Sequence, residues 1–161
     1  MTFCFISVCI ILFAAFLLRE SFLNIMIKEF PSAYGYEETI NIIKERISNK
    51  KGWHLFGVID QGSEIVANGG SPVGRIAIIH YCHGGFASMM FSADSRKKIS
   101  VFSPKAVSVY EKKDGKTYIA MMNGGLMKLL SSGEMREIVK AVSREVKEIF
   151  VVLHKKEQNL S

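Results

Sequence analysis

The sequence predicts an α+β fold, in which an antiparallel sheet carries two main helices packed on one face and one N-terminal transmembrane helix precedes the domain. Three observations support this. Apolar residues recur at helical spacing in two stretches, one near each end of the domain. Short runs rich in Ile, Val and Tyr lie between them, and an Asp-Gly turn joins the last two. The first eighteen residues contain no charged side chain.

The domain is expected to begin with a strand at residues 25–30, which Pro31 ends. A helix over residues 36–50 follows, because four apolar side chains recur every three or four positions: Tyr36, Ile40, Ile43 and Ile47. Two glutamates in its first turn suit the positive end of the helix dipole. Gly52 can end the helix.

The middle of the chain predicts strands separated by breaks. Residues 54–65 have the pattern of a strand, although an internal glycine and a turn signal at residues 60–62 shorten or break it. Residues 75–82 predict a second strand with two apolar faces, which is typical of a position inside a sheet. A Gly-Gly pair ends that strand, and residues 86–93 predict a short helix.

A hairpin and a long helix complete the domain. Residues 106–111 and 117–122 flank Asp114-Gly115, the strongest local signal in the chain. The closing helix is predicted from one apolar stripe, which consists of Met135, Ile138, Val139, Val142, Val146, Ile149, Phe150 and Leu153. This stripe is expected to cover the sheet.

Residues 3–18 predict an uncleaved membrane anchor. As a helix these sixteen residues span about 24 Å, slightly less than the roughly 30 Å hydrocarbon core of a bilayer. Arg19 can snorkel to the interface, and the apolar residues after it can make up the difference. A cleaved signal peptide would have a basic start and small residues at its exit, and neither is present. We therefore expect residues 1–24 to be the anchor and residues 25–161 the domain.

The sequence predicts a single-pass membrane protein and leaves the side of the domain open. Arg19 and Lys28 follow the apolar segment and no basic residue precedes it, so the positive-inside rule places the domain in the cytoplasm. A segment of this kind before one folded domain is more often an export signal or a signal anchor. We expect the extracytoplasmic side.

Composition argues against several classes of protein. Lysine and arginine outnumber acidic residues by 21 to 15. Seven basic residues crowd one stretch: Arg96, Lys97, Lys98, Lys105, Lys112, Lys113 and Lys116. No RNA-binding motif, zinc finger or basic recognition helix accompanies them, so we expect a solvated surface and no nucleic-acid partner. Three cysteines in no paired spacing argue against a disulfide framework, structural zinc and covalent haem.

The cluster His80, Cys82 and His83 is the candidate ligand or metal site. His80 and Cys82 lie on one face of the predicted strand, and the Gly-Gly pair behind them lets backbone amides approach a ligand. A helix starting there would favour a thiolate or a bound anion. In the competing interpretation Cys82 is a small buried apolar residue and His80 a satisfied core histidine.

Methionines suggest a cofactor for that cluster. The chain contains the pairs Met89-Met90 and Met121-Met122, then Met127 and Met135. Thioether, imidazole and thiolate ligands together suit a soft metal such as copper(I), and histidine with methionine can hold haem axially. Flexible filling of the core is the simpler explanation of the methionines.

At residues 81–90 (Tyr-Cys-His-Gly-Gly-Phe-Ala-Ser-Met-Met), residues 102–110 (Phe-Ser-Pro-Lys-Ala-Val-Ser-Val-Tyr) and Asp114-Gly115, the chain resembles the domain of unknown function 302 family. The resemblance covers residues 25–150. It implies a sheet with two helices in β-α-β(4)-α order, similar to the TATA-binding protein, and no established activity.

Two departures from the family pattern affect the chemistry that the resemblance implies. Cys82 matches the first cysteine of the family and Pro104 its proline, whereas His83 and Gly84 replace Asn-Pro. Lys105 stands where many relatives carry a second cysteine. The resemblance therefore does not support a mechanism with two cysteines here.

The sequence thus leads to two hypotheses. No acid pair, Ser-His-Asp set or phosphate loop is present, so we expect a non-catalytic, membrane-tethered module that binds a ligand or assists another protein. The alternative is a redox, sulfur-handling, soft-metal or haem-binding protein centred on Cys82 with His80 or His83. The lipid bilayer is the expected partner, and a protein partner or a homodimer stays open.

Overall fold

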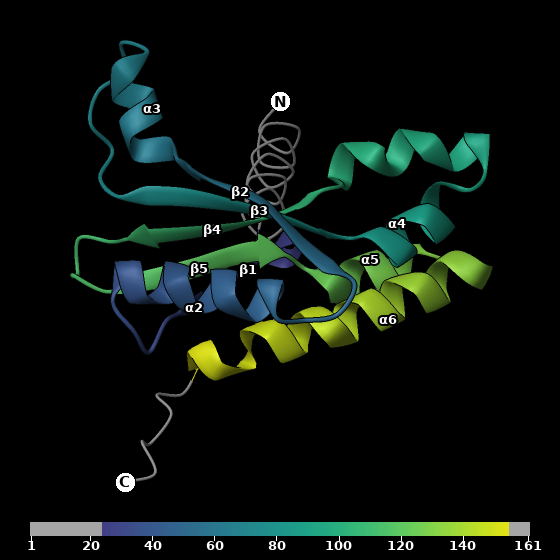
Figure 1. The fold of residues 1–161 in the computed structure, drawn as a ribbon. Coiled ribbons are helices and arrows are strands. Elements are labelled where there is room, and N and C mark those ends of the chain that lie inside the picture. The colour runs from purple at the N-terminus through teal and green to yellow at the C-terminus, as the bar shows by residue number, and fades with distance from the viewer. Residues whose placement is uncertain (1–23, 155–161) are drawn as a thin grey trace, which may run out of the picture.

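A computed structural model describes residues 24–154 of the chain. Their sheet is five-stranded and antiparallel, with the strand order β1-β5-β4-β3-β2 (Figure 1). This confirms the predicted α+β fold. The predicted transmembrane segment, residues 3–18, lies outside the described residues. Between residues 24 and 154 no helix has the length and apolarity needed to cross a bilayer.

The strands agree closely with the predicted ones. Their bounds are β1 Ile27–Pro31, β2 Trp53–Asp60, β3 Ile76–His83, β4 Lys105–Glu111 and β5 Thr117–Met122. Strands β4 and β5 form the hairpin around Asp114-Gly115, with Val109 opposite Ile119. In β3 buried and partly buried residues alternate, as the pleat of a strand requires. Strand β1 ends at Pro31, as predicted, and Pro31 itself can pair in the sheet because β1 is an edge strand.

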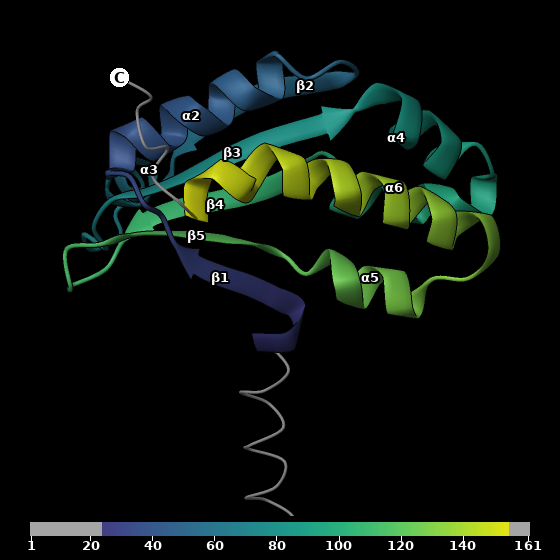
Figure 2. The same ribbon diagram turned by 90° about the horizontal axis from the view of Figure 1, so that it is seen from below.

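Two long helices cover one face of the sheet, as predicted (Figure 2). They are α2 (Tyr36–Ser48) and α6 (Gly133–Phe150), and α6 continues as the 3-10 helix η2 (Val151–His154). Between this layer and the sheet lies one core, in which Ile43, Ile79 and Ile149 are almost completely buried. Arg46 ties the helices together, because its Nε donates to the Ile149 carbonyl at 2.7 Å and its Nη2 to that of Glu148 at 2.8 Å.

Four short helices complete the described fold, and the sequence predicted only one of them. That one is α4 (Gly84–Phe91); the others are α3 (Gln61–Ala67), the 3-10 helix η1 (Asp94–Phe102) and α5 (Gly124–Leu130). The turn signal at residues 60–62 is in fact a helix start, because the Asp60 carboxylate accepts from the Ser63 amide at 3.0 Å. The Asn123 side chain caps α5 in the same way, accepting from the Gly125 amide at 3.0 Å.

Candidate functional site

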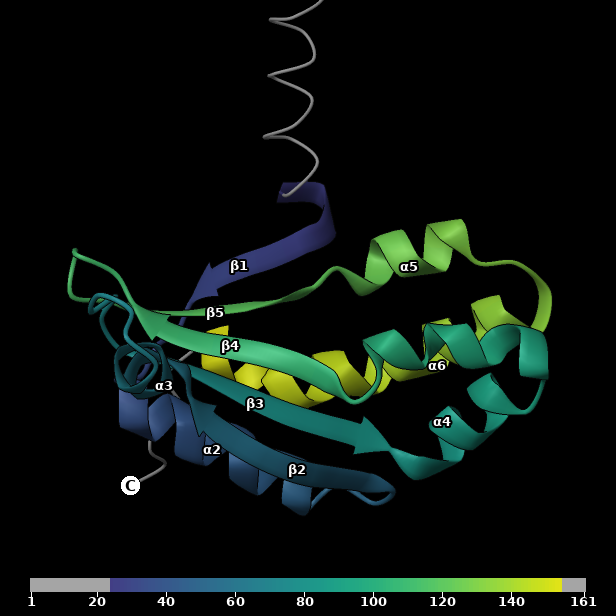
Figure 3. The same ribbon diagram turned by 90° about the horizontal axis from the view of Figure 1, so that it is seen from above.

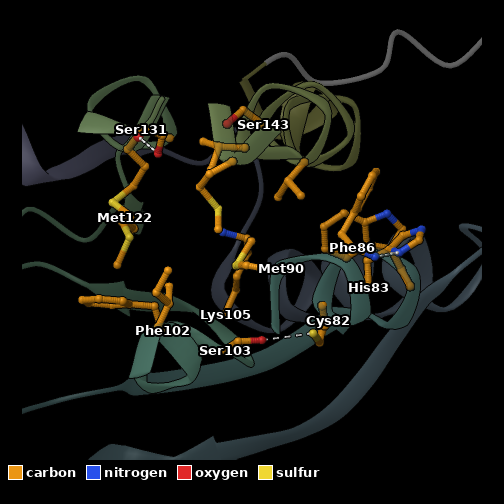
Figure 4. Close-up of a pocket in the computed structure, with 18 residues that line it drawn as sticks. Cys82, His83, Phe86, Met90, Phe102, Ser103, Lys105, Met122, Ser131 and Ser143 are labelled. Carbon is orange, nitrogen blue, oxygen red and sulfur yellow. Dashed lines mark hydrogen bonds between the residues drawn. The ribbon is translucent and has the colours of Figure 1, made fainter. Parts of the chain in front are cut away.

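A cavity of about 110 Å³ lies at the end of the sheet where β3 and β5 end and β4 begins (Figure 4). Residues of α4, η1, α5 and α6 enclose it. Most of the side chains that face it are apolar, among them Phe86, Met90, Phe102, Met127, Met135 and Val139. Such a site, apolar with a few polar groups, has the character of a pocket for a small molecule.

Lys105 contributes the charged group of this cavity. It is the first residue of β4 and pairs with Tyr81, so its side chain lies on the helix-covered face together with Val107. Burial in these apolar surroundings lowers the pKa of the Lys105 amine, and the neighbouring Cys82 thiol opposes the shift. None of the described residues that line the cavity is acidic. Within residues 24–154, Lys105 also forms no ion pair.

Cys82 lines the same cavity from the end of β3. The thiol is free and partly buried, and its Sγ lies 3.3 Å from the Ser103 hydroxyl oxygen, close enough for a hydrogen bond (Figure 4). Ser103 stands just before β4 and two residues before Lys105. The thiol and the amine therefore enter the cavity from neighbouring strands.

His83 has a structural role beside the cavity. Its Nδ1 accepts a hydrogen bond from the Phe86 amide at 3.2 Å and so caps α4, and its ring contacts the Trp53 and Phe86 rings. The bend at Gly52 lies against this imidazole. Gly52 has a φ of +83°, and a Cβ there would stand 2.2 Å from Nε2 of His83. The aromatic packing therefore requires glycine at this position.

The structure brings together part of the predicted cluster. Cys82 and His83 both line the cavity, whereas His80 does not. His80 pairs with Ala106 on the face of β3 opposite to that of Tyr81, away from α2 and α6. In the described part of the chain, no three residues of the His, Cys, Asp and Glu types lie close enough together to hold a metal ion.

The position of Lys105 corrects an expectation from the sequence, which assigned it to a solvated basic surface. Its neighbours in that stretch, Lys112, Lys113 and Lys116, are exposed as expected. Lys105 is partly buried because side chains alternate along β4, and this places it on the same face as Val107 and Val109. That alternation was the signal in the sequence that could have identified it.

Comparisons with known proteins agree with this fold. The family model described as "Domain of unknown function DUF302" matches residues 28–153. A crystal structure of an uncharacterized conserved DUF302 protein from Bacillus stearothermophilus is similar, with a TM-score of 0.67 and 16% sequence identity. The alignment covers 80% of this chain and 98% of that one. No curated protein matches significantly.

Proposed function

Because this chain belongs to the DUF302 family, whose function is unknown, we propose a function from its pocket. The domain is a non-catalytic module that binds a small apolar anion, and its N-terminal segment holds it at a membrane. Lys105 carries the proposal, because its amine lies in an apolar cavity. Among the described residues this amine has no ion-pair partner, and no acidic side chain lines the cavity.

The energetics favour an anionic ligand. An enclosed ammonium without a counter-charge is unfavourable, and this is why the Lys105 pKa is lowered. A bound carboxylate would supply the counter-charge and form a charge-assisted hydrogen bond, worth about 1.5–3 kcal/mol. The apolar walls would bury the body of the ligand. Since a cavity of about 150 Å³ accepts benzene, this one suits a short chain.

The polar groups beside Lys105 support a binding role over a catalytic one. The Cys82 thiol is hydrogen-bonded to Ser103, and Nδ1 of His83 accepts the amide that begins α4. Both are therefore engaged in contacts that shape the cavity. In this proposal they position the walls, and Lys105 makes the polar contact with the ligand.

The proposal is tested with two ligands of equal chain length, butanoate and butan-1-ol, on protein that lacks residues 1–18 and that circular dichroism has shown to be folded. Titration calorimetry should show butanoate binding about 10–100-fold more tightly than the alcohol, from the energy of the charged hydrogen bond. Lys105→Met should abolish this preference. The control Lys113→Met, at an exposed lysine on the hairpin, should keep it. Equal affinities of the unsubstituted protein for both ligands would refute the role of Lys105.

A soft-metal site is the second candidate, because the Cys82 thiol and the methionines Met90, Met127 and Met135 line the same cavity. Thiolate and thioether ligands select copper(I). The cavity is too small to enclose a haem, so haem is not proposed. Anaerobic titration with copper(I) and a competing chelator separates the candidates. Binding that Cys82→Ser abolishes and Lys105→Met retains would favour the metal.

The membrane part of the proposal rests on the uncharged residues 3–18. In this proposal residues 3–18 anchor the chain in the bilayer, and the domain faces the extracytoplasmic side. Deleting residues 1–18 should release the domain to the soluble fraction without unfolding it, because the described sheet and helices all follow that segment. Protease added to sealed cells should cut the domain if it faces outward.

A further inference from the structure

We propose that a second, peripheral membrane contact is built into the domain, on an edge formed by the start of β1 and by α5. This inference rests on the proposed membrane anchor and extends it. The β1–α5 surface consists of five exposed apolar side chains: Ile25, Ile27, Met122, Leu129 and Leu130. The two leucines are each 73% exposed, an unusual exposure for adjacent large apolar residues.

Asn123 joins the two parts of this surface. Its backbone amide donates to the Met26 carbonyl and its side-chain Nδ2 to the Ile25 carbonyl, both at 2.8 Å. The same side chain caps the first turn of α5. Ile27 lies opposite Met122 in the sheet register. The start of β1 and the start of α5 are therefore fixed side by side, as Figure 3 shows.

The helix α5 extends this apolar edge outward from Asn123. It runs over the seven residues Gly124–Leu130, which corresponds to about 10 Å along the helix axis. Leu129 and Leu130 lie at its far end, in a loosely packed part of the fold where no residue of α5 is buried. The sequence departs here from the usual pattern, in which a surface helix turns its largest apolar residues toward the core.

The connection to the N-terminal segment identifies the bilayer as the occupant. The residues that the structure describes begin at Asn24, immediately before Ile25. Only the five residues 19–23 separate Asn24 from the apolar segment 3–18, and five residues in extended conformation would reach at most about 18 Å. An anchored segment 3–18 therefore holds this edge of the domain within the headgroup region or close to it.

The charge beside the surface agrees with this occupant. Lys128, next to Leu129 in α5, is exposed and forms no ion pair within residues 24–154. Apolar side chains beside a lysine are typical of segments that lie in a membrane interface. Lys128 can contact anionic headgroups while the leucines enter the acyl boundary.

Tryptophan quenching tests the contact in the full-length chain, reconstituted into vesicles of phosphatidylcholine and phosphatidylglycerol (3:1) with or without brominated acyl chains. The probe variant is Leu129→Trp. The matched control is Phe56→Trp, at a 60% exposed residue of β2. Strand β2 is the opposite edge of the sheet, four strand spacings or about 19 Å from β1. The signal of Trp53, present in the unsubstituted protein, is subtracted.

We expect brominated lipid to reduce the added emission of the Leu129→Trp variant at least twofold and to leave that of the Phe56→Trp variant unchanged. If the chain floats with vesicles but both probes respond equally, the anchor stands and the β1–α5 contact is refuted. If the chain does not float, anchor and contact both fail. An oligomer in detergent that Leu130→Asp dissociates, together with an unquenched Leu129→Trp probe, would instead assign the surface to a second copy.

Discussion

The helix layer differs between its two ends. Where α2 and α6 lie on the sheet, each of these helices has five buried residues. Where α4, η1 and α5 surround the cavity, none of these three helices has a buried residue. Arg46 locks the first region through two hydrogen bonds to carbonyls at the end of α6. Stability is therefore carried by one part of this small domain, and the proposed ligand binding is assigned to another.

The side chains at the two ends match this division. Branched aliphatic residues with few rotamers, such as Ile43, Ile47 and Ile79, fill the well-packed core. Methionines, which adapt to irregular gaps, line the cavity. One domain can thus combine a rigid core with an adaptable cavity wall, which the proposed ligand binding requires. The predictions below test this comparison between the core and the cavity.

The largest effect is expected in the core. Ile149→Ala should lower the free energy of unfolding by about 2–5 kcal/mol, because Ile149 is 1% exposed and the substitution leaves a cavity. Val151→Ala, two residues further on at a half-exposed position, should cost about 0.5 kcal/mol or less. Urea denaturation measures both. Equal losses would show that the end of α6 contributes no specific packing.

The next effect concerns the link between core and cavity. His83→Ala should cost about 1–2 kcal/mol, since it removes the cap of α4 and the ring contacts with Trp53 and Phe86. His83→Asn keeps a side-chain acceptor and should recover part of the loss. Urea midpoints and hydrogen exchange of the α4 amides provide the measurement. If both variants lose the same stability, the cap contributes nothing.

A smaller effect is expected at the cavity wall. Cys82→Ser should cost about 1 kcal/mol or less, because the hydroxyl can replace the thiol in the contact with Ser103. The thiol should also react slowly with a bulky maleimide, since it is partly buried. Destabilisation as severe as that of Ile149→Ala would instead make Cys82 a core residue and remove its functional interpretation.

The smallest effect depends on pH. The pKa of Lys105 in the folded protein lies below its ordinary value of 10.5, so the unfolded chain binds this proton more tightly. Burying the charged amine therefore costs stability at neutral pH, and the cost disappears as pH rises through the folded pKa toward 10.5. The Lys105→Met variant has no amine to bury and is free of this stability cost. Its stability advantage in urea denaturation should shrink between pH 7 and 10.5, and a constant difference would contradict the burial of the amine.

The sequence alone predicted the elements that depend on periodicity. An apolar run with two apolar faces identified β3, the Asp114-Gly115 turn identified both hairpin strands, and the apolar stripe of α6 was correct in that Ile138, Val142 and Phe150 are buried. These patterns are local, because the period of a strand or helix decides which side chains share a face. The short helices α3, η1 and α5 have too few turns for such a pattern, and their start signals resemble those of turns.

Only the tertiary structure decided how these elements form a site. The sequence grouped His80, Cys82 and His83 into one cluster, but only Cys82 and His83, the last two residues of β3, line the cavity, where His83 caps a helix, and His80 lies further back in the strand. Lys105 is 23 positions beyond Cys82 in the chain and meets it through the pairing of β3 with β4. Strand pairing and helix packing bring such distant residues together, and neither can be read from the spacing of residues along one strand.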